Sequence, residues 1–251
     1  MLKQTALLFG LLLLACTPPN KKEQAALWIA KANIAHGTDL LSATSFSFQF
    51  REYRYAYSKN NGQKVYSRSR VTEAGLLTDS LVNDRDFYRW IGEEKVSLPD
   101  SLIQKYTESL NSVLYFVQLP KVLKDPAVVA EYMGKTKIKG ESYIALKVSF
   151  QQAGGGVDFK DEYRYWIHEE KQLIEYLAYR FYTNGGGTRF RAIMHRERHA
   201  GFVLQDYENY KAYEKFPSLD DLPRLYEQQA LQLVSTIENK DFQFLDKSLR
   251  Y

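Results

Sequence analysis

Apolar residues near the start of the chain recur at the spacing of a helix. Between residues 23 and 36 they lie three and four positions apart, which places them on one helical face. Gly37 follows directly, and glycine is a common residue just after the last turn of a helix. The sequence therefore predicts a helix over 23–36 whose buried stripe comprises Ala26, Ile29, Ala30, Asn33 and Ile34.

From Ser45 onward the apolar pattern changes to a period of two. Phe46, Phe48 and Phe50 alternate with polar residues, and tyrosines at positions 53, 55 and 57 continue the alternation. This pattern is typical of a strand with one buried face, and the Asn-Asn-Gly sequence at 60–62 indicates a hairpin turn. Further strands are predicted over 65–72, 76–81, 87–91 and 95–98.

The second half of the chain combines helical stretches with a long series of strands. Pro99 opens a helical stretch over 100–117, a shorter helical piece follows over 127–133, and an amphipathic helix over 219–239 closes the pattern. The predicted strands cover 136–139, 143–151, 159–169, 173–183, 188–197 and 202–211. No linker or repeat interrupts 23–239, so we expect a single ligand-binding-type domain there, followed by a C-terminal tail over 240–251.

This order of elements predicts an α+β fold in which helices pack on one face of an antiparallel meander. The succession of one helix, several strands, a helical excursion, long hairpins and a last helix resembles the LolA/LolB-like fold of lipoprotein localisation factors. The resemblance implies an open half-barrel of antiparallel strands that wraps around its helices and leaves an apolar cavity.

The first sixteen residues carry a targeting pattern. A positive start at Lys3 precedes an apolar run over 5–15, which fits a secretory signal and is too short to span a bilayer. The run ends in Leu-Leu-Ala-Cys at 13–16, which resembles a bacterial lipobox. The resemblance implies a signal peptide over 1–15, acylation of Cys16 and a short lipidated tether over 16–22, whereas the alternative is an ordinary signal with a chance cysteine.

The location implied by this pattern is the cell envelope. No aspartate follows Cys16, which by the same resemblance favours the outer membrane over the inner one. The membrane, reached through acylated Cys16, is therefore the first expected partner, and the sequence does not identify protein partners.

Composition narrows the classes of function. Thirty-four basic and 30 acidic residues give a net charge of only +4, with no basic cluster, which argues against a nucleic-acid partner. The single cysteine excludes an internal disulfide framework or a cysteine-rich zinc site. Nineteen tyrosines and 14 phenylalanines favour β-structure.

Three segments are similar to motifs of a known family. Gln-Gln-Ala-Gly-Gly-Gly at 151–156, Tyr-Trp-Ile at 165–167 and Thr-Asn-Gly-Gly-Gly-Thr-Arg-Phe-Arg at 183–191 resemble a Gram-negative (Bacteroidetes-type) family of envelope lipoproteins. The resemblance covers 23–215 and implies a lipoprotein, but no activity, because none is assigned to that family.

The glycine-rich segment at 184–187 predicts a hairpin with one of two registers. A turn at 184–185 pairs Tyr179 with Phe190, and a turn at 185–186 pairs Phe181 with Phe190. Both registers place the apolar residues on one face, as a core wall or the lining of a cavity. Both also set Arg180 across from another arginine on the second face, which would destabilise the strand pair.

The second face of this hairpin is the candidate ligand-binding surface. Its arginines are compensated either by carboxylates on neighbouring strands, namely Glu162, Asp206 or Glu208, or by an anionic ligand such as a phosphate, carboxylate or lipid head group. On the second alternative, the expected ligand-binding residues are Trp166, Tyr176, Arg180, Tyr182, Arg189 and Arg191.

No catalytic or metal-binding set is predicted. His195 and His199 would lie about 13 Å apart along an extended strand, too far to share a zinc ion. The glycine clusters lack the lysine of a phosphate-binding loop, so they are predicted to be turns. Carboxylates are concentrated near predicted turns and form no recognisable acid–base pair; examples are Asp84, Asp86, Glu93 and Glu94.

We therefore expect a membrane-anchored lipoprotein that binds a lipid or another amphipathic molecule, anionic ones included, without catalysis and without a cofactor. Tyrosine suits such a site because its ring is apolar and its hydroxyl is polar. Two alternatives remain open. One is a periplasmic hydrolase that uses carboxylates and tyrosines in the same cleft, and the other is an envelope interaction protein with a filled core.

Overall fold

The computed structural model describes residues 19–60, 62–151 and 160–245. The predicted signal peptide, Cys16 and most of the glycine-rich segment at 151–156 lie outside these residues. The chain begins its regular structure with helix α1 (Lys21–His36), which is capped by the side chain of Asn20 in a capping box with Glu23. Gly37 ends the helix with φ 65°, as the sequence predicts.

The buried face of α1 differs from the predicted stripe. Ile34 is 76% exposed, and the helix instead packs its buried residues against the second sheet: Ala25, Ile29, Ala32, Asn33 and His36. Asn33 donates to the backbone oxygen of Ile29 and accepts from the Thr38 hydroxyl. A short helix α2 (Leu40–Ala43) then leads into the first strand.

Two seven-stranded antiparallel sheets form the body of the protein within the described residues. The first has the order β14-β1-β2-β3-β4-β5-β6. Its strands are β1 (Ser45–Phe50), β2 (Tyr53–Asn60), β3 (Gln63–Thr72), β4 (Gly75–Val82), β5 (Asp86–Ile91), β6 (Glu94–Val96) and β14 (Lys240–Leu245).

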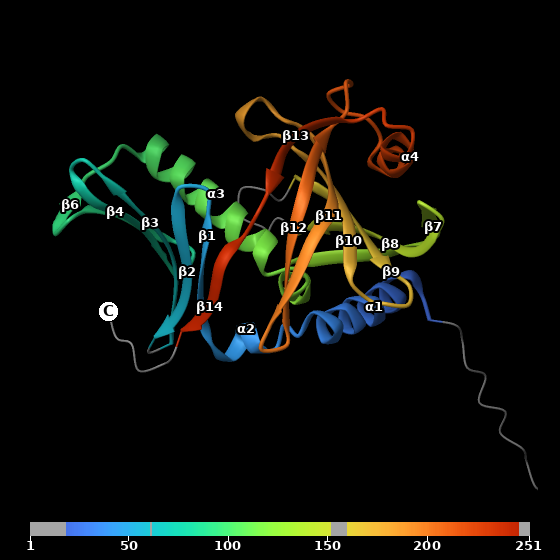
Figure 1. Cartoon of the computed structure of the whole chain (residues 1–251), viewed down its shortest axis with the longest axis horizontal. Coiled ribbons are helices and arrows are strands. Elements are labelled where there is room, and N and C mark those ends of the chain that lie inside the picture. Colours follow the sequence, from blue (N-terminus) through green and yellow to red (C-terminus); the bar gives the residue numbers. More distant parts are fainter. Residues whose placement is uncertain (1–18, 61, 152–159, 246–251) are drawn as a thin grey trace, which may run out of the picture.

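The second sheet has the order β13-β12-β11-β10-β9-β8-β7. Its strands are β7 (Val128–Ile138), β8 (Glu141–Phe150), β9 (Glu162–His168), β10 (Ile174–Phe181), β11 (Gly187–His199), β12 (Phe202–Lys211) and β13 (Gln232–Ile237). The chain passes from β13 directly into β14, so the outer strands of the two sheets follow one another (Figure 1).

The two sheets form an open half-barrel around helix α3 (Asp100–Val117) (Figure 1). Leu110 and Leu114 of α3 are fully buried against the first sheet, whereas Tyr115 and Phe116 pack against the core of the second. The α+β half-barrel predicted from the sequence is confirmed. The short helices η4 (Leu219–Asp221) and α4 (Leu222–Glu227) cover the opposite face of the second sheet.

Three segments differ from the sequence prediction, and each forms a strand at the edge of a sheet. Residues 127–133 belong mainly to β7, and the second part of the predicted helix over 219–239 is β13. The segment predicted as a tail begins with β14, which pairs with β1. In each case the neighbouring strand has backbone N–H and C=O groups along its open edge. A helix or a tail in the added segment would leave these groups without strand partners.

The register of the β10–β11 hairpin also differs from both predicted alternatives. Tyr179 pairs with Arg189 and Arg180 pairs with Thr188, so Arg180 does not face another arginine. The reason is the connection: it contains a 3-10 turn over Thr183–Gly185 and therefore five residues between the strands instead of two. The register is shifted by one residue from the first alternative and by three from the second, and either odd shift reverses the face on which each β11 side chain lies.

Candidate functional site: an aromatic groove between the sheets

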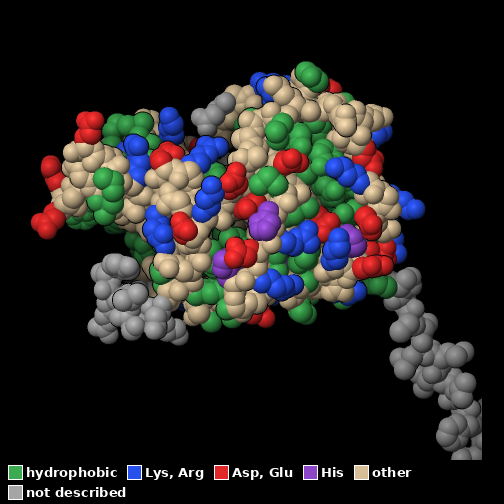
Figure 2. Space-filling view, in the orientation of Figure 1, with side chains coloured by type: hydrophobic (Ala, Val, Ile, Leu, Met, Phe, Trp, Pro, Cys, Tyr) green, Lys and Arg blue, Asp and Glu red, His purple; other side chains and the backbone are tan. Residues whose placement is uncertain are grey.

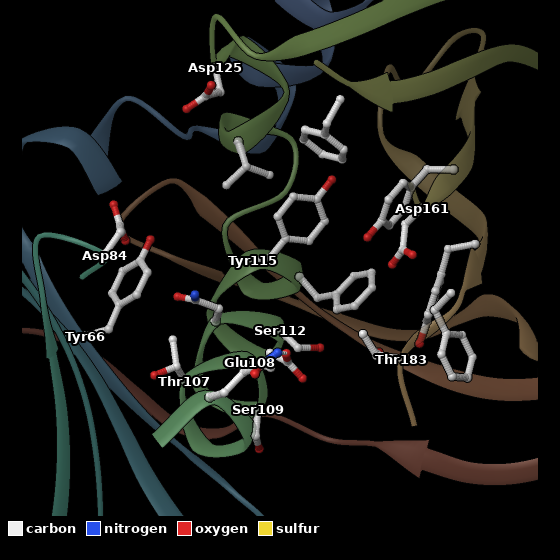
Figure 3. A pocket seen from close by; sticks show the side chains of 18 of the residues that line it. Tyr66, Asp84, Thr107, Glu108, Ser109, Ser112, Tyr115, Asp125, Asp161 and Thr183 are labelled. Atoms are coloured by element: carbon white, nitrogen blue, oxygen red, sulfur yellow. Dashed lines mark hydrogen bonds between the residues drawn. The ribbon is translucent and has the colours of Figure 1, made fainter. Parts of the chain in front are cut away.

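The main candidate site is a groove of about 760 Å³ between the two sheets. In Figure 3, α3 runs through its centre, with Tyr66 and Asp84 of the first sheet on one side and Asp161 and Thr183 on the other. The volume lies in the range of small-molecule sites. The half-barrel thus holds a space large enough for a ligand beside its own central helix.

Stacked aromatic rings form the wall of the groove on the side of the second sheet. The ring of Tyr179 lies 5.8 Å from that of Tyr163 and 5.1 Å from that of Phe116, between centroids. Tyr115 of α3 contacts Phe150 and Tyr163 at 6.2 and 5.8 Å. Such rings present a rigid apolar surface at low cost in side-chain entropy.

The hydroxyl groups beneath this wall are paired with one another. The Tyr115 and Tyr165 hydroxyls lie 2.8 Å apart, and burial raises the pKa of both phenols above the ordinary value. Both groups are therefore neutral at physiological pH. Each hydroxyl is the hydrogen-bond partner of the other, and the wall carries no charge on this side.

The opposite border of the groove is polar. It is formed by the side of α3 that carries Gln104, Glu108, Asn111 and Ser112, together with Lys64 and Asp84 of the first sheet. Glu108 accepts a hydrogen bond from Gln104, and Lys64 pairs with Asp84. An apolar wall facing a polar border suits an amphipathic molecule.

Three of the predicted ligand-binding residues lie on the other face of the second sheet, away from the groove. Trp166 and Tyr176 are buried there around Phe190, in the cluster covered by Leu219 and Leu222. Burial raises the pKa of Tyr176 to about 12. These side chains fill a closed core under η4 and α4 and do not line the groove.

Arg180 lies on this same covered face and has partners of its own. Its guanidinium group forms an ion pair with Glu162 at 3.4 Å and donates to the carbonyl of Pro217 at 2.8 Å. Glu162 is one of the carboxylates that the sequence offered as compensation. The structure therefore places Arg180 apart from Arg189 and Arg191, and the predicted pairing of arginine side chains across the hairpin is wrong.

The remaining three predicted residues lie near or beneath the groove. Tyr182 is 51% exposed at the end of β10 and stacks on Phe216 at 6.0 Å. Arg189 lines the groove and lies over the Phe181 ring. The changed register turns Arg191 to the same face, where its guanidinium group lies 3.6 Å from the centroid of the Phe116 ring.

Sequence reasoning missed the contribution of α3. It identified Tyr179 and Phe181 as members of a core wall or cavity lining, but it did not include Tyr115, Phe116 or Ser112. The sequence did contain a signal for this contribution. Residues 100–117 combine aromatic residues with many polar ones, too many for a helix that is buried on all sides.

The described residues contain neither a cluster of metal ligands nor a long apolar helix. No group of three or more histidine, cysteine, aspartate or glutamate side chains in residues 19–60, 62–151 and 160–245 could hold a metal ion. In the same part of the chain, no helix has the length and apolar character needed to cross a bilayer. Basic and acidic side chains intermingle over the face shown in Figure 2.

Comparison with known proteins places this geometry in a wider context. The model of a family described as a family of unknown function (DUF6503) matches residues 3–239. No curated protein matches the chain at a significant level.

Solved structures resemble the chain in fold. A LolA superfamily protein from Nitrosomonas europaea is 14% identical with a TM-score of 0.51, and the match covers 88% of this chain and 94% of that one. A DUF1329 family protein from Desulfovibrio piger is 12% identical, with the same coverages and a TM-score of 0.41. A putative outer membrane lipoprotein-sorting protein domain from Vibrio parahaemolyticus is 8% identical, with coverages of 92% and 94% and a TM-score of 0.38. The first of these matches shows a LolA-like fold.

Proposed function

The chain belongs to the DUF6503 family of unknown function, and we propose that it binds a lipid or another amphipathic molecule, without catalysis, in the groove between its sheets. One observation carries the proposal: the groove of about 760 Å³ combines an aromatic wall with a polar border. A bound acyl chain would cover the aromatic rings. The polar head of the ligand would lie at the polar border or against a polar side chain further inside.

We further propose that the protein works in the cell envelope, attached to the outer membrane through acylated Cys16. The lipobox-like sequence at 13–16 supports this proposal. Helix α1 begins at Lys21, so four residues separate it from Cys16, and the five residue-to-residue steps between them span at most about 18 Å when extended. The groove would then lie close to the lipid layer from which a ligand can enter.

The anchor is tested by replacing Cys16 with serine in the full-length chain. In a Gram-negative host, we expect the unchanged protein to incorporate labelled fatty acid and to fractionate with membranes, because two or more acyl chains hold a protein stably at a bilayer. The C16S protein should lose both properties. Equal labelling of the two proteins would contradict acylation at Cys16.

The groove is tested by filling it from α3. Ser112 is exposed and lines the groove, so Ser112→Trp in the C16S background should place a large ring where the ligand lies. We expect organic extracts of the purified C16S protein to contain stoichiometric lipid by mass spectrometry, and the S112W protein to retain less than about a tenth of it.

Ser101→Trp is the matched control, because Ser101 is an exposed residue at the start of the same helix and does not line the groove. It should leave the lipid content unchanged. If the C16S protein carries no lipid and takes up none from vesicles, the proposed function is wrong. Hydrolysis of an ester substrate that is lost in S112W would favour the enzyme alternative.

A further inference from the structure

A second, smaller cavity of about 50 Å³ lies beneath the groove, on the inner side of α3. Ser112 and Phe116, one helical turn apart, line both cavities. The side chains of Arg191, Gln205, Tyr207 and Asn239 also line the inner cavity. The rest of its lining is apolar and includes Phe50 and Ile237. One turn of α3 thus separates the groove from a small space of mixed polar and apolar lining.

Arg191 is a buried cation on this inner cavity. The residue is 8% exposed, its guanidinium group stacks on Phe116, and its Nη2 donates to the Tyr179 hydroxyl at 3.2 Å. Its Nε is buried and has no hydrogen-bond partner among the described residues. Burying a charged group without a counter-ion or a full set of hydrogen bonds is costly.

The other buried arginines in the described part of the chain are compensated. Arg68 forms an ion pair with Asp79 at 2.9 Å, and Arg164 forms one with Asp220 at 2.7 Å. None of the ion pairs found in residues 19–60, 62–151 and 160–245 involves Arg191. The interior therefore holds one positive charge that its own described carboxylates do not neutralise.

The neighbouring polar groups leave this charge available. The Tyr207 hydroxyl donates to the Gln205 side chain at 3.0 Å, and the Gln205 amide donates to the carbonyl of Ile174. The amide of Asn239 donates to the carbonyl of Gln205 at 2.9 Å. These groups are engaged with one another, so an anion in the inner cavity would be bound mainly by the guanidinium group of Arg191.

The size of the inner cavity favours a small anion. A water molecule needs roughly 10–15 Å³ measured in this way, so the cavity holds about three to five groups of that size. A carboxylate has three heavy atoms and fits this space, whereas a phosphate monoester has five and fills it. Carboxylates also match the planar fork of a guanidinium group in shape.

We propose that the ligand is a long-chain carboxylate that binds with its head inward, with the carboxylate at Arg191 and the acyl chain along the aromatic wall of the groove. This inference rests on the proposed function of the groove. The head group passes from the groove into the inner cavity around the side of α3, past the side chains of Ser112, which Figure 3 shows beside the groove, and Phe116. The ring of Phe116 moves off the guanidinium group as the carboxylate replaces it.

The experiment compares charged and uncharged ligands of the same chain length on the delipidated, full-length C16S protein. Affinities for oleate, methyl oleate and oleyl phosphate are measured by displacement of a fluorescent probe. We expect oleate to bind at least tenfold more tightly than methyl oleate and more tightly than oleyl phosphate. Arg191→Met should abolish the preference for oleate while methyl oleate binds within about twofold of its original affinity.

Arg180→Met is the control on the opposite face of the sheet, and it should leave the preference intact. Arg191→Lys should keep part of the preference because it keeps the charge.

Loss of affinity for both ligands in R191M, or an unchanged preference, would overturn the inference and leave the proposed function standing. Equal affinity for oleate and methyl oleate in the C16S protein would also overturn it, whether or not R191M folds. Preferred binding of oleyl phosphate would contradict the carboxylate assignment, and binding of none of the three would remove the proposed function as well.

Discussion

Replacing Asp79 with asparagine is expected to reduce the free energy of unfolding by about 3–5 kcal/mol, the usual result of breaking a buried ion pair. Asp79 is fully buried on β4 and accepts from Arg68 at 2.9 Å and from Arg89 at 2.7 and 2.9 Å. The hydrogen bonds to Asp79 raise the pKa of Arg89 above its ordinary value. Without the carboxylate, two guanidinium groups would remain close together without a counter-charge.

The same cluster holds α3 against the first sheet. Arg68 donates to the Ser109 hydroxyl at 2.9 Å, and the Arg89 guanidinium group lies 3.9 Å from the centroid of the Tyr106 ring. Since α3 forms the centre of the groove, we expect Asp79→Asn to weaken ligand binding together with stability.

Urea denaturation followed by circular dichroism measures this effect. Asp84→Asn is the matched control, because Asp84 is paired with Lys64 at the exposed border of the same sheet and should cost less than about 1 kcal/mol. A loss below about 1 kcal/mol for D79N would show that the two arginines do not depend on this carboxylate.

The second large effect is a loss of stability in mild acid caused by His36. The side chain is fully buried, and its Nε2 accepts from the backbone N–H of Ile174 at 3.0 Å, so the folded protein holds the neutral ring. Burial, and secondarily the charges of Arg196 and Arg198, lowers the pKa of His36 from 6.5 to about 3. Although His36 lies in the last turn of α1, where a positive charge would interact favourably with the helix dipole, its ring is therefore neutral.

The sign of the pH dependence follows from this lowered pKa. Above pH 6.5 the His36 ring is neutral in both the folded and the unfolded chain, and the neutral ring makes its full contribution to the free energy of unfolding. As the pH falls from 6.5 towards 3, only the unfolded chain takes up the proton, and stability decreases by up to about 1.4 kcal/mol per pH unit. The expected loss at pH 4.5 is therefore about 2–3 kcal/mol.

Unfolding curves of the wild type and His36→Gln between pH 4.5 and 7.5 test this prediction. The glutamine can accept from Ile174 but does not titrate, so the difference in stability between the two proteins should change by about 2–3 kcal/mol over this range. His195→Gln, at an exposed position of β11, is the control. A constant difference between wild type and H36Q would show that His36 is not the source of the acid sensitivity.

The β10–β11 hairpin shows where sequence reasoning reaches its limit. Alternation of apolar and polar residues indicates that both segments are strands, but two strands with alternate patterns can be aligned in several ways. The 3-10 turn over Thr183–Gly185 sets the actual alignment. That difference, one residue from the first alternative and three from the second, moves Arg191 from the expected outer face to the interior beneath the groove.

The sequence by itself determined the local elements of this protein. The helices 21–36 and 100–117 and most strands follow from periodicity and from residues such as Gly37 and Pro99, because these signals act between neighbours in the chain. The order of the elements indicated an α+β fold, and the resemblance to the LolA/LolB-like fold implied the half-barrel.

Only the tertiary structure decided the rest. The edge strands β7, β13 and β14 form because a distant strand offers backbone partners, which overrides weak local preferences. The groove exists because the two sheets leave space beside α3, where the rings of α3 pack on those of the second sheet, and Arg191 is buried beneath it because of a register set by one turn. Pairing, register and burial depend on residues far apart in the chain, and periodicity along the sequence does not contain that information.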